Sequence, residues 1–236
     1  MERHKHDMTA KVDAALIKTL KQYDTPTLAN AVETFDIRRR DEGYTRQGLR
    51  CMFPELGAVV GVAATATIRA SGEITSDPDI DKFADLYEHV SAQPAPTFVV
   101  VHDRDQPEQV GSMWGEVNAA VFQALGCVGS ITDGTVRDLT EVRATGFQFF
   151  AAGAGVSHGY VRLETVGEPV TICGLRVEPG DLLHGDQHGV LSIPKEIAHE
   201  IPAAADRVLA REQRFIRWIR SDEFDPDQLS ATRMQH

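Results

Sequence analysis

The hydrophobic pattern changes period several times along the chain. Apolar residues recur at the helical spacing of three and four in four stretches, which predicts helices at 11–22, 23–35, 78–90 and 112–127. Runs of β-branched and other apolar residues without that spacing predict strands at 57–70, 97–103, 127–132 and 147–153. A further short helix is predicted at 139–146. Residues 97–153 therefore predict a parallel α/β arrangement in the order strand, helix, strand, helix, strand.

The pattern changes after Gly153. Residues 161–194 are typical of a series of short strands separated by Gly and Pro turns. A helix is predicted from about Pro194 to Ser221, with Pro202 as a break or restart, because proline lacks the amide that a helix interior needs. We therefore expect an N-terminal helical extension, a single domain and a polar, loose tail, with the bounds 1–23, 24–221 and 222–236.

Composition and charge exclude several classes of protein. A formal charge of −11 over 236 residues argues against a nucleic-acid surface, which would show a basic stripe, and suits a divalent cation. No run of about 18 apolar residues that could span a membrane occurs, and the N-terminus lacks the apolar core of a signal peptide. We expect a cytoplasmic protein without nucleic-acid or membrane partners. The three cysteines are widely spaced, which predicts small buried thiols at Cys51, Cys127 and Cys173.

Two loops qualify as a ligand site, because ligands of parallel α/β sheets collect beyond the carboxyl ends of the strands. The first loop leads into "GEVN", residues 115–118, which opens a helix. Gly115 lets the backbone approach a ligand closely, and the first free amides of a helix bind carboxylate or phosphate. The alternative is a plain helix start, in which Glu116 complements the helix dipole.

The second loop is "DGTVRD", residues 133–138. Arg137 has the geometry to grip a carboxylate with two parallel hydrogen bonds, and Asp138 offers oxygen to a hard cation. The alternative is a surface ion pair plus a helix cap. Asp133 is interpreted as a turn residue ahead of Gly134.

Two further patterns are ambiguous. His184, Asp186 and His188 alternate, so on a strand they would share one face, either as a cupin-like metal site or as a polar loop with glycine kinks. Glu212 lies on the apolar stripe of the last helix, where a carboxylate needs a partner. That partner is either in the active site of a neighbouring subunit or a nearby arginine, Arg211 or Arg214.

Taken together, the motifs resemble one family. "GEVNAAVFQALGCVGSITDGTVRD" matches the pattern G-[ED]-x-x, about 18 residues, then D-G-x-x-R-D. "EPGDLLHGDQHGVLSIP" is similar to V-x-P-G-D-x-x-x-x-D-x-x-G-V-x-x-I-P. The chain resembles, over residues 24 to about 215, the class II 4-hydroxy-4-methyl-2-oxoglutarate aldolases. This RraA-like family also contains the regulator of ribonuclease activity A.

The resemblance implies a swivelling β/β/α domain with αββα layers, a parallel α/β half and a β-rich C-terminal half. It also implies a homotrimer or hexamer and a Mg²⁺- or Mn²⁺-dependent lyase. Such an enzyme cleaves a small 4-hydroxy-2-keto acid to release pyruvate and decarboxylates oxaloacetate. No Schiff-base lysine is then required, because a divalent cation stabilises the pyruvate enolate. The alternative is a non-catalytic regulator that binds protein partners, and the presence of Asp138 favours the enzyme.

Carried over by position, the resemblance implies a role for each motif residue. The amides of Gly115, Glu116, Val117 and Asn118 would hold the pyruvyl carboxylate, which Arg137 also binds, while Asp138 ligates the metal. Glu116 would orient a metal-bound water. Glu212 of a neighbouring subunit would contact the ligands of the metal without touching the metal itself. The adjacent residue Gln213 is the other candidate for this position. The chain departs from the family at His188 and Asn30, where acids are common, which leaves the substrate open.

Overall fold

The longest strand, β2 (Val59–Arg69), lies at the centre of a mixed sheet. In the computed structural model, which describes residues 12–72, 79–105 and 109–234, the sheet has eight strands. Their order is β1 (Arg50–Cys51), β6 (Gln148–Ala151), β4 (Cys127–Thr132), β3 (Thr97–Asp103), β2, β11 (Leu182–Asp186) and β12 (Gly189–Ile193), and β8 (Arg162–Val166) also pairs with β2. Strands β3, β4 and β6 run parallel, as predicted. Strand β2 also runs parallel to β3, and the remaining strands of this sheet are antiparallel to their neighbours.

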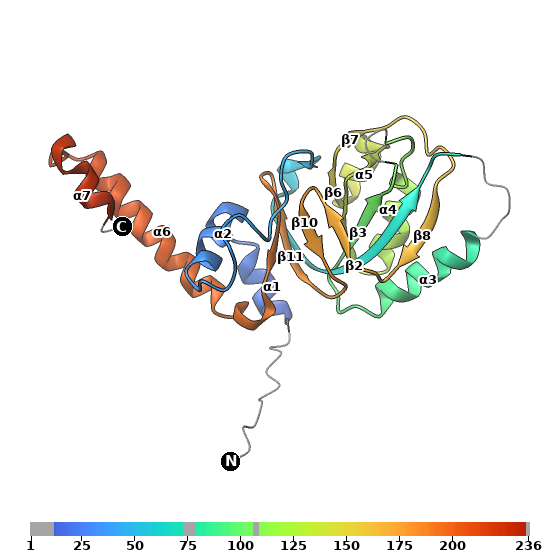
Figure 1. Cartoon of the computed structure of the whole chain (residues 1–236), viewed down its shortest axis with the longest axis horizontal. Helices are drawn as coiled ribbons and strands as arrows, with labels where there is room; N and C mark the ends of the chain where they lie inside the picture. Colours follow the sequence, from blue (N-terminus) through green and yellow to red (C-terminus); the bar gives the residue numbers. More distant parts are fainter. Residues whose placement is uncertain (1–11, 73–78, 106–108, 235–236) are drawn as a thin grey trace, which may run out of the picture.

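One face of the parallel strands is covered by α3 (Asp79–Ser91), α4 (Glu116–Ala124) and α5 (Leu139–Thr145) (Figure 1). The core on this side is aromatic, since Trp114 lies with its ring centroid 5.1 Å from Phe122 and 6.1 Å from Phe147. Such contacts between offset aromatic rings add to the hydrophobic stabilisation of a core. This packing fixes the start of α4 relative to the sheet.

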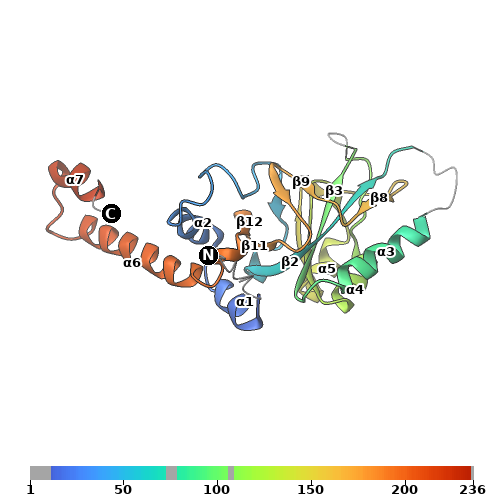
Figure 2. The same ribbon diagram turned by 60° about the horizontal axis from the view of Figure 1, so that its bottom comes forward.

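The opposite face of the sheet packs on a hairpin made of β9 (Val170–Ile172) and β10 (Leu175–Val177). Beyond the sheet edge, α1 (Ala14–Leu20), α2 (Thr25–Glu33) and the first turns of α6 (Ile201–Ile219) pack against β11 and β12. The result is a layered arrangement of helices, sheet, hairpin and helices (Figures 1 and 2). It confirms the predicted α/β fold with a β-rich C-terminal half.

The helix predicted at 112–127 begins later, at Glu116. The preceding residues are extended: Ser112 donates its amide to Ser157 (2.9 Å), and Trp114 forms a parallel bridge with Val136. Val136 belongs to β5 (Thr135–Val136), which pairs with β7 (Gly153–Ala154). The sequence did not predict this small sheet, which joins the two loops of interest.

The C-terminal segment is more structured than predicted. It contains 3₁₀ helices at Lys195–Ile197 and Pro226–Gln228 and the helix α7 (Leu229–Met234). A further 3₁₀ helix, at Pro54–Leu56, lies in the N-terminal half of the chain. Helix α6 begins at Ile201 with Pro202 in its first turn, so the proline marks a restart, as expected. Within the segment predicted as a polar tail, 222–236, Phe224 packs edge-on against Trp218 at 5.2 Å. None of the described helices is long and apolar enough to cross a membrane.

Candidate active site

The carboxylate of Asp138 lies at the start of helix α4. Its Oδ2 atom accepts a hydrogen bond from the amide of Glu116 at 3.0 Å. The Nε atom of Arg137 lies 3.9 Å from the same oxygen, and the amide of Arg137 donates to the carbonyl of Trp114 at 3.0 Å. The structure therefore brings together residues that the sequence placed in two separate loops.

Gly115 allows this close approach. A methyl group at Gly115 would overlap the Asp138 carboxylate and would stand 3.2 Å from Cγ and Nε of Arg137. The backbone of Gly115 is extended, so the requirement is for space and not for an unusual conformation. Glycine is thus needed here to let the Asp138 side chain reach the helix start.

Asp138 itself has a left-handed backbone, with φ 55° and ψ 41°, at the N-terminus of α5. Aspartate tolerates this conformation better than most residues. Its side chain makes no hydrogen bond to α5, although the residue occupies the cap position of that helix. Of the predicted alternative, an ion pair plus a helix cap, the structure shows the ion pair with Arg137 at 3.9 Å, whereas the carboxylate turns to α4 and does not cap α5. The Asp138 side chain remains 36% exposed and that of Arg137 37%, so both are accessible to a ligand.

Helix α4 presents its N-terminus to the same place. Gly115 provides no side-chain cap, so the first amides of the helix depend on outside partners. One of them, Glu116, is bonded to Asp138, and the side chain of Asn118 donates to the carbonyl of Met113 at 2.7 Å. The positive end of a helix dipole next to the guanidinium of Arg137 favours an anion.

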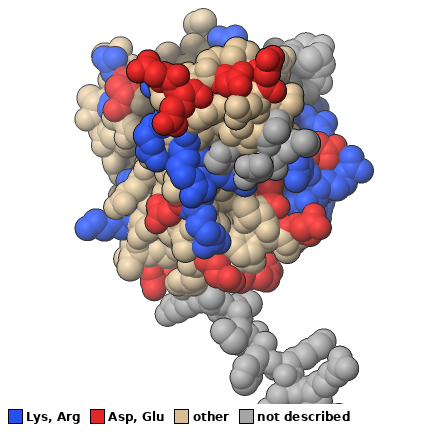
Figure 3. All heavy atoms as spheres, turned by 90° about the vertical axis from the view of Figure 1, so that its left-hand side faces the viewer, with Lys and Arg blue, Asp and Glu red and all other residues tan. Residues whose placement is uncertain are grey.

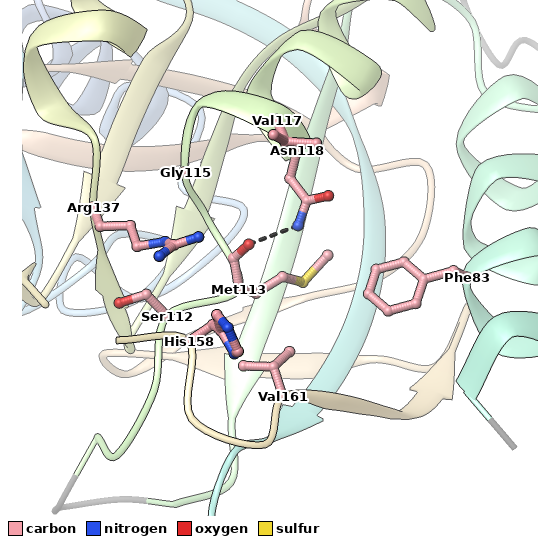
Figure 4. A pocket seen from close by; sticks show the side chains of 9 residues that line it. All are labelled: Phe83, Ser112, Met113, Gly115, Val117, Asn118, Arg137, His158 and Val161. Atoms are coloured by element: carbon pink, nitrogen blue, oxygen red, sulfur yellow. Dashed lines mark hydrogen bonds between the residues drawn. The ribbon is translucent and has the colours of Figure 1, made fainter. Parts of the chain in front are cut away.

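A pocket of about 280 Å³ opens beside this helix start. Figure 4 shows its lining, which consists of Phe83, Ser112, Met113, Gly115, Val117, Asn118, Arg137, His158 and Val161. Four of the predicted substrate-binding residues are among them, and Asp138 adjoins through its contacts with Gly115 and Glu116. Sequence reasoning missed Phe83, Ser112, Met113, His158 and Val161. They come from separate segments and carry no motif of their own.

A network of buried acids lies at the ends of β3 and β4. Asp133 is 8% exposed, and its carboxylate accepts the amide of Asp103 (2.8 Å) and pairs with Nδ1 of His102 (2.7 Å). The hydrogen bond that His102 donates to Asp133 raises the pKa of His102 against the opposing effect of burial. Burial also raises the pKa of Asp103. Asp133 is therefore more than the predicted turn residue, since it joins the ends of β3 and β4.

The histidines near residue 186 do not form a metal site. Nε2 of His184 donates to the carbonyl of Tyr23 (3.1 Å), so Nδ1 is the acceptor for the hydroxyl of Thr25 (3.0 Å). Burial lowers the pKa of this fully buried ring to about 4. The carboxylate of Asp186 accepts the amides of Thr25 and His188. Across the part of the chain that the structure describes, no group of three or more His, Cys, Asp and Glu side chains could hold a metal.

Glu212 lies far from the pocket of its own chain. Helix α6 extends from the end of the molecule opposite α4 and α5 (Figures 1 and 2). Oε1 of Glu212 accepts a hydrogen bond from Asn30 on α2 at 3.3 Å, so its observed partner is neither of the predicted arginines. Figure 3, seen from this end, shows a band of Lys and Arg side chains. Helix α6 and the residues after it carry exposed arginines at 207, 211, 214 and 217 and exposed acids at 206, 212, 222 and 223, so this end is mixed in charge.

The three cysteines lie away from the pocket lining. Cys127 is buried, whereas Cys51 and Cys173 are partly exposed, so the prediction of buried thiols is confirmed only for Cys127. Burial raises the pKa of Cys127 to about 12 and that of Cys51 to about 11. Thiols with such a raised pKa are poor nucleophiles at neutral pH.

Comparison with known proteins identifies related sequences. A provisionally named 4-hydroxy-4-methyl-2-oxoglutarate aldolase of Halalkalibacterium halodurans is 29% identical over 138 residues, which cover 58% of this chain and 60% of that protein. An uncharacterised protein of Methanocaldococcus jannaschii is 30% identical over 118 residues, or 50% of this chain and 57% of that protein. The chain thus spans less than two thirds of the length of these relatives.

Solved structures share the fold. An uncharacterised protein from Pseudomonas syringae pv. tomato superposes with a TM-score of 0.73 at 22% identity and covers 100% of both chains. Streptomyces coelicolor RraAS2, described as an unusual member of the RNase ES inhibitor RraA family, gives a TM-score of 0.68 at 23% identity and covers 88% of this chain and 100% of that one. These likenesses concern the fold alone.

The family model described as RraA-like, Aldolase/RraA, matches residues 25–192. This range contains the first motif and all but the last two residues of the second, and it includes the pocket lining from Phe83 to Val161. The chain therefore belongs to the RraA-like family.

Proposed function

We propose that the protein is a divalent-metal-dependent lyase that cleaves a 4-hydroxy-2-keto acid and releases pyruvate. One observation carries the proposal: a carboxylate, a guanidinium and an uncapped helix start converge beside one pocket, at Asp138, Arg137 and Gly115. A 2-keto acid offers a carboxylate for the cationic groups and a chelating pair of oxygens for a metal. The family membership and the aldolase name of one relative support the same chemistry.

The chemistry of Asp138 fits a hard divalent cation. Mg²⁺ is usually held by one or two carboxylates together with waters and substrate oxygens, so a cage of protein ligands is not needed. Asp138 supplies one such carboxylate, and its side chain is 36% exposed to incoming ligands. When bound, Mg²⁺ or Mn²⁺ would act as a Lewis acid toward the keto oxygen and stabilise the negative charge of the pyruvate enolate.

The chain's own residues would bind and orient the substrate. Arg137 would bind the carboxylate through two parallel hydrogen bonds, which hold the keto acid in one plane. The free first-turn amides of α4 would add to this contact at the positive end of the helix. Because the Glu116 amide is bonded to Asp138, the amides of Val117 and Asn118 are the better candidates. The side chain of Glu116 would serve in proton transfer.

Glu212 would complete the site of a neighbouring subunit. It stands on the helix that extends away from its own pocket, so a contribution to catalysis requires another copy of the chain. We therefore propose a trimer or a pair of trimers, in which α6 of one subunit approaches the pocket of the next.

The decisive experiment measures pyruvate release from oxaloacetate and from 4-hydroxy-2-keto acids, with Mg²⁺ and with a chelator. Turnover that depends on Mg²⁺ and is lost in Asp138→Asn is expected. A folded protein that releases no pyruvate from any of these substrates would instead indicate the non-catalytic regulator.

A further inference from the structure

The pocket beside α4 is divided into a polar and an apolar end. Arg137 and Ser112 lie at one side of Figure 4, next to the helix start at Gly115. On the other side, the side chain of Met113 extends toward the ring of Phe83. Val161 adds an aliphatic surface to this end. A substrate held by its carboxylate at Arg137 would therefore extend its far half onto an apolar wall.

The cations around the pocket are unevenly distributed. Among the described residues that line it, Arg137 is the one permanently charged cation. Two other arginines near the carboxyl ends of the strands are already paired with acids. Arg69 pairs with Glu164 at 2.8 Å and with Asp105 at 3.3 Å, and Arg104 pairs with Glu164 at 3.0 Å. Lys82, next to Phe83 in the chain, donates to the carbonyl of Glu164 at 3.1 Å.

His158 adds a hydrogen-bonding group to the pocket lining. The loop that carries it is fixed by the bond from the Ser112 amide to the carbonyl of Ser157. Nδ1 of His158 lies 2.7 Å from the carbonyl of Gly159 and must donate to it, so Nε2 is the ring nitrogen that remains for a ligand. A substrate hydroxyl group suits this nitrogen, because a hydroxyl group can both donate and accept a hydrogen bond.

We propose that the substrate's far half is uncharged and apolar, so that the enzyme cleaves 4-hydroxy-2-keto acids with an alkyl or aryl group on C4. In this reaction the 4-hydroxyl loses its proton, the C3–C4 bond breaks, and C4 becomes the carbonyl of an aldehyde. The bonding electrons form the pyruvate enolate, which takes a proton at C3 to give pyruvate. A second carboxylate on C4 would be desolvated against Met113 and Phe83 without a cation. This inference rests on the proposed lyase function.

Two substrates of nearly equal shape test it. 4-Hydroxy-5-methyl-2-oxohexanoate carries an isopropyl group on C4, where 4-hydroxy-2-oxoglutarate carries a carboxylate. The expected kcat/KM with Mg²⁺ is at least about tenfold higher for the isopropyl substrate, because an unpaired charge discriminates more strongly than a missing methylene. Equal or faster cleavage of the carboxylate substrate would overturn the inference.

Two variants of Phe83 test the role of the apolar end by itself. Phe83 is only half-buried, so Phe83→Lys can place an ammonium group at the apolar end while keeping contact with water. We expect it to shift the ratio of the two kcat/KM values toward the carboxylate substrate by about tenfold, whereas Phe83→Leu should keep the isopropyl preference. An unchanged ratio in Phe83→Lys, with a melting temperature close to that of the parent protein, argues against the apolar end as the binding place.

Oxaloacetate distinguishes this inference from the function on which it rests. If Mg²⁺-dependent decarboxylation of oxaloacetate is present but 4-hydroxy-5-methyl-2-oxohexanoate is not cleaved, the inferred substrate class is wrong and the metal-dependent lyase stands. If no substrate releases pyruvate, the proposed function itself fails.

Discussion

Asp138 and Glu116 are 22 residues apart in the chain, yet the carboxylate of the first accepts the backbone amide of the second at 3.0 Å. This bond ties the loop after β4 to the first turn of α4. It gives the Asp138 carboxylate a fixed orientation, because a charge-assisted hydrogen bond to an amide is stronger and shorter than a neutral one. A carboxylate fixed in this way is suited to hold a cation beside a bound anion.

Replacing Asp138 should separate metal chemistry from folding. Asparagine keeps an oxygen acceptor for the Glu116 amide and tolerates the left-handed backbone, but it lacks the negative charge that a cation needs. We expect Asp138→Asn to reduce Mg²⁺-dependent turnover of oxaloacetate by about 100-fold or more. The unfolding free energy should change by no more than about 1 kcal/mol.

A matched control removes a neighbouring charge without touching the site. Glu141→Gln, on the exposed first turn of α5, should keep normal turnover and Mg²⁺ dependence. The measurements are pyruvate release against Mg²⁺ concentration and calorimetric Mg²⁺ binding. Full Mg²⁺-dependent activity in Asp138→Asn would falsify the assignment of Asp138 to the metal.

Gly115 should be sensitive even to alanine. The added methyl group would overlap the Asp138 carboxylate and must push it away from the helix start. Since misplacing a catalytic group by about 1 Å costs about 100-fold in rate, we expect Gly115→Ala to reduce kcat/KM by one to two orders of magnitude, that is, about 10- to 100-fold. Gly153→Ala is the control, because a methyl group there meets nothing within 4 Å. Equal activities of the two variants would show that the close approach is unimportant.

The sequence predicted the parallel core well for a physical reason. Strands buried on both faces are continuous apolar runs, and helices that cover them repeat at 3.6 residues, so local patterns record the layers. The motif at 133–138 was also informative, because charge after a buried strand is unusual. The start of α4 was predicted four residues early, since the pairing of Trp114 with Val136 is a long-range contact that no local period records.

The pocket lining was less accessible to sequence reasoning. Phe83 looked like any apolar helix position, and His158 looked like any loop residue; only the fold brings them to the same cavity as Arg137. The alternating pattern of His184, Asp186 and His188 left two interpretations open. Burial decided between them, because both ring nitrogens of His184 are occupied by Tyr23 and Thr25.

His184 should make stability depend on pH. In the unfolded chain its pKa is near 6.5, whereas burial lowers it to about 4 in the folded protein. The unfolded chain therefore binds the proton first, and the unfolding free energy should fall as the pH drops from 6.5 toward 4. The loss amounts to about 3 kcal/mol, on the order of 1.36 kcal/mol for each pKa unit.

Chemical denaturation at several pH values between 4 and 7 measures this slope. In His184→Gln the slope over this window should become much flatter, while stability at pH 7 also falls because the hydrogen bonds change. The carboxyl group of Asp186 has a lowered pKa, through amide hydrogen bonds that outweigh its burial, so its contribution disappears only below its usual value of 3.8. Titration of the His184 ring above pH 6, followed by NMR, would contradict the prediction.

Glu212 should act in trans if the oligomer is built as proposed. Asp138→Asn and Glu212→Gln are each expected to lower oxaloacetate turnover. Co-expressed in one cell with different affinity tags, the two variants should form mixed oligomers in which some sites hold both native residues. Doubly purified mixed oligomers should regain about a quarter to a third of the parental activity.

Two controls accompany this complementation. Glu223→Gln, at an exposed position beyond α6, should lose no activity. Sedimentation equilibrium should give a trimer or a multiple of it at micromolar concentration. A monomer, or mixed oligomers no more active than either variant alone, would remove Glu212 from the neighbouring site.

Arg137 offers the sharpest distinction between a substrate contact and a surface ion pair. Charge-assisted hydrogen bonds contribute about 1.5–3 kcal/mol each, so losing one or two should lower kcat/KM by about one to four orders of magnitude. Arg137→Lys should be impaired because an ammonium group cannot reproduce the two-point contact, and Arg137→Ala should be impaired further. Mg²⁺ affinity should change little, since Asp138 remains.

Arg143→Ala is the control variant. Arg143 is an exposed α5 residue that pairs with Glu55 at 3.6 Å, and such surface pairs contribute at most about 1 kcal/mol to stability. Steady-state kinetics with oxaloacetate at saturating Mg²⁺ measure the difference, and Arg137→Ala as active as Arg143→Ala would exclude Arg137 from substrate binding.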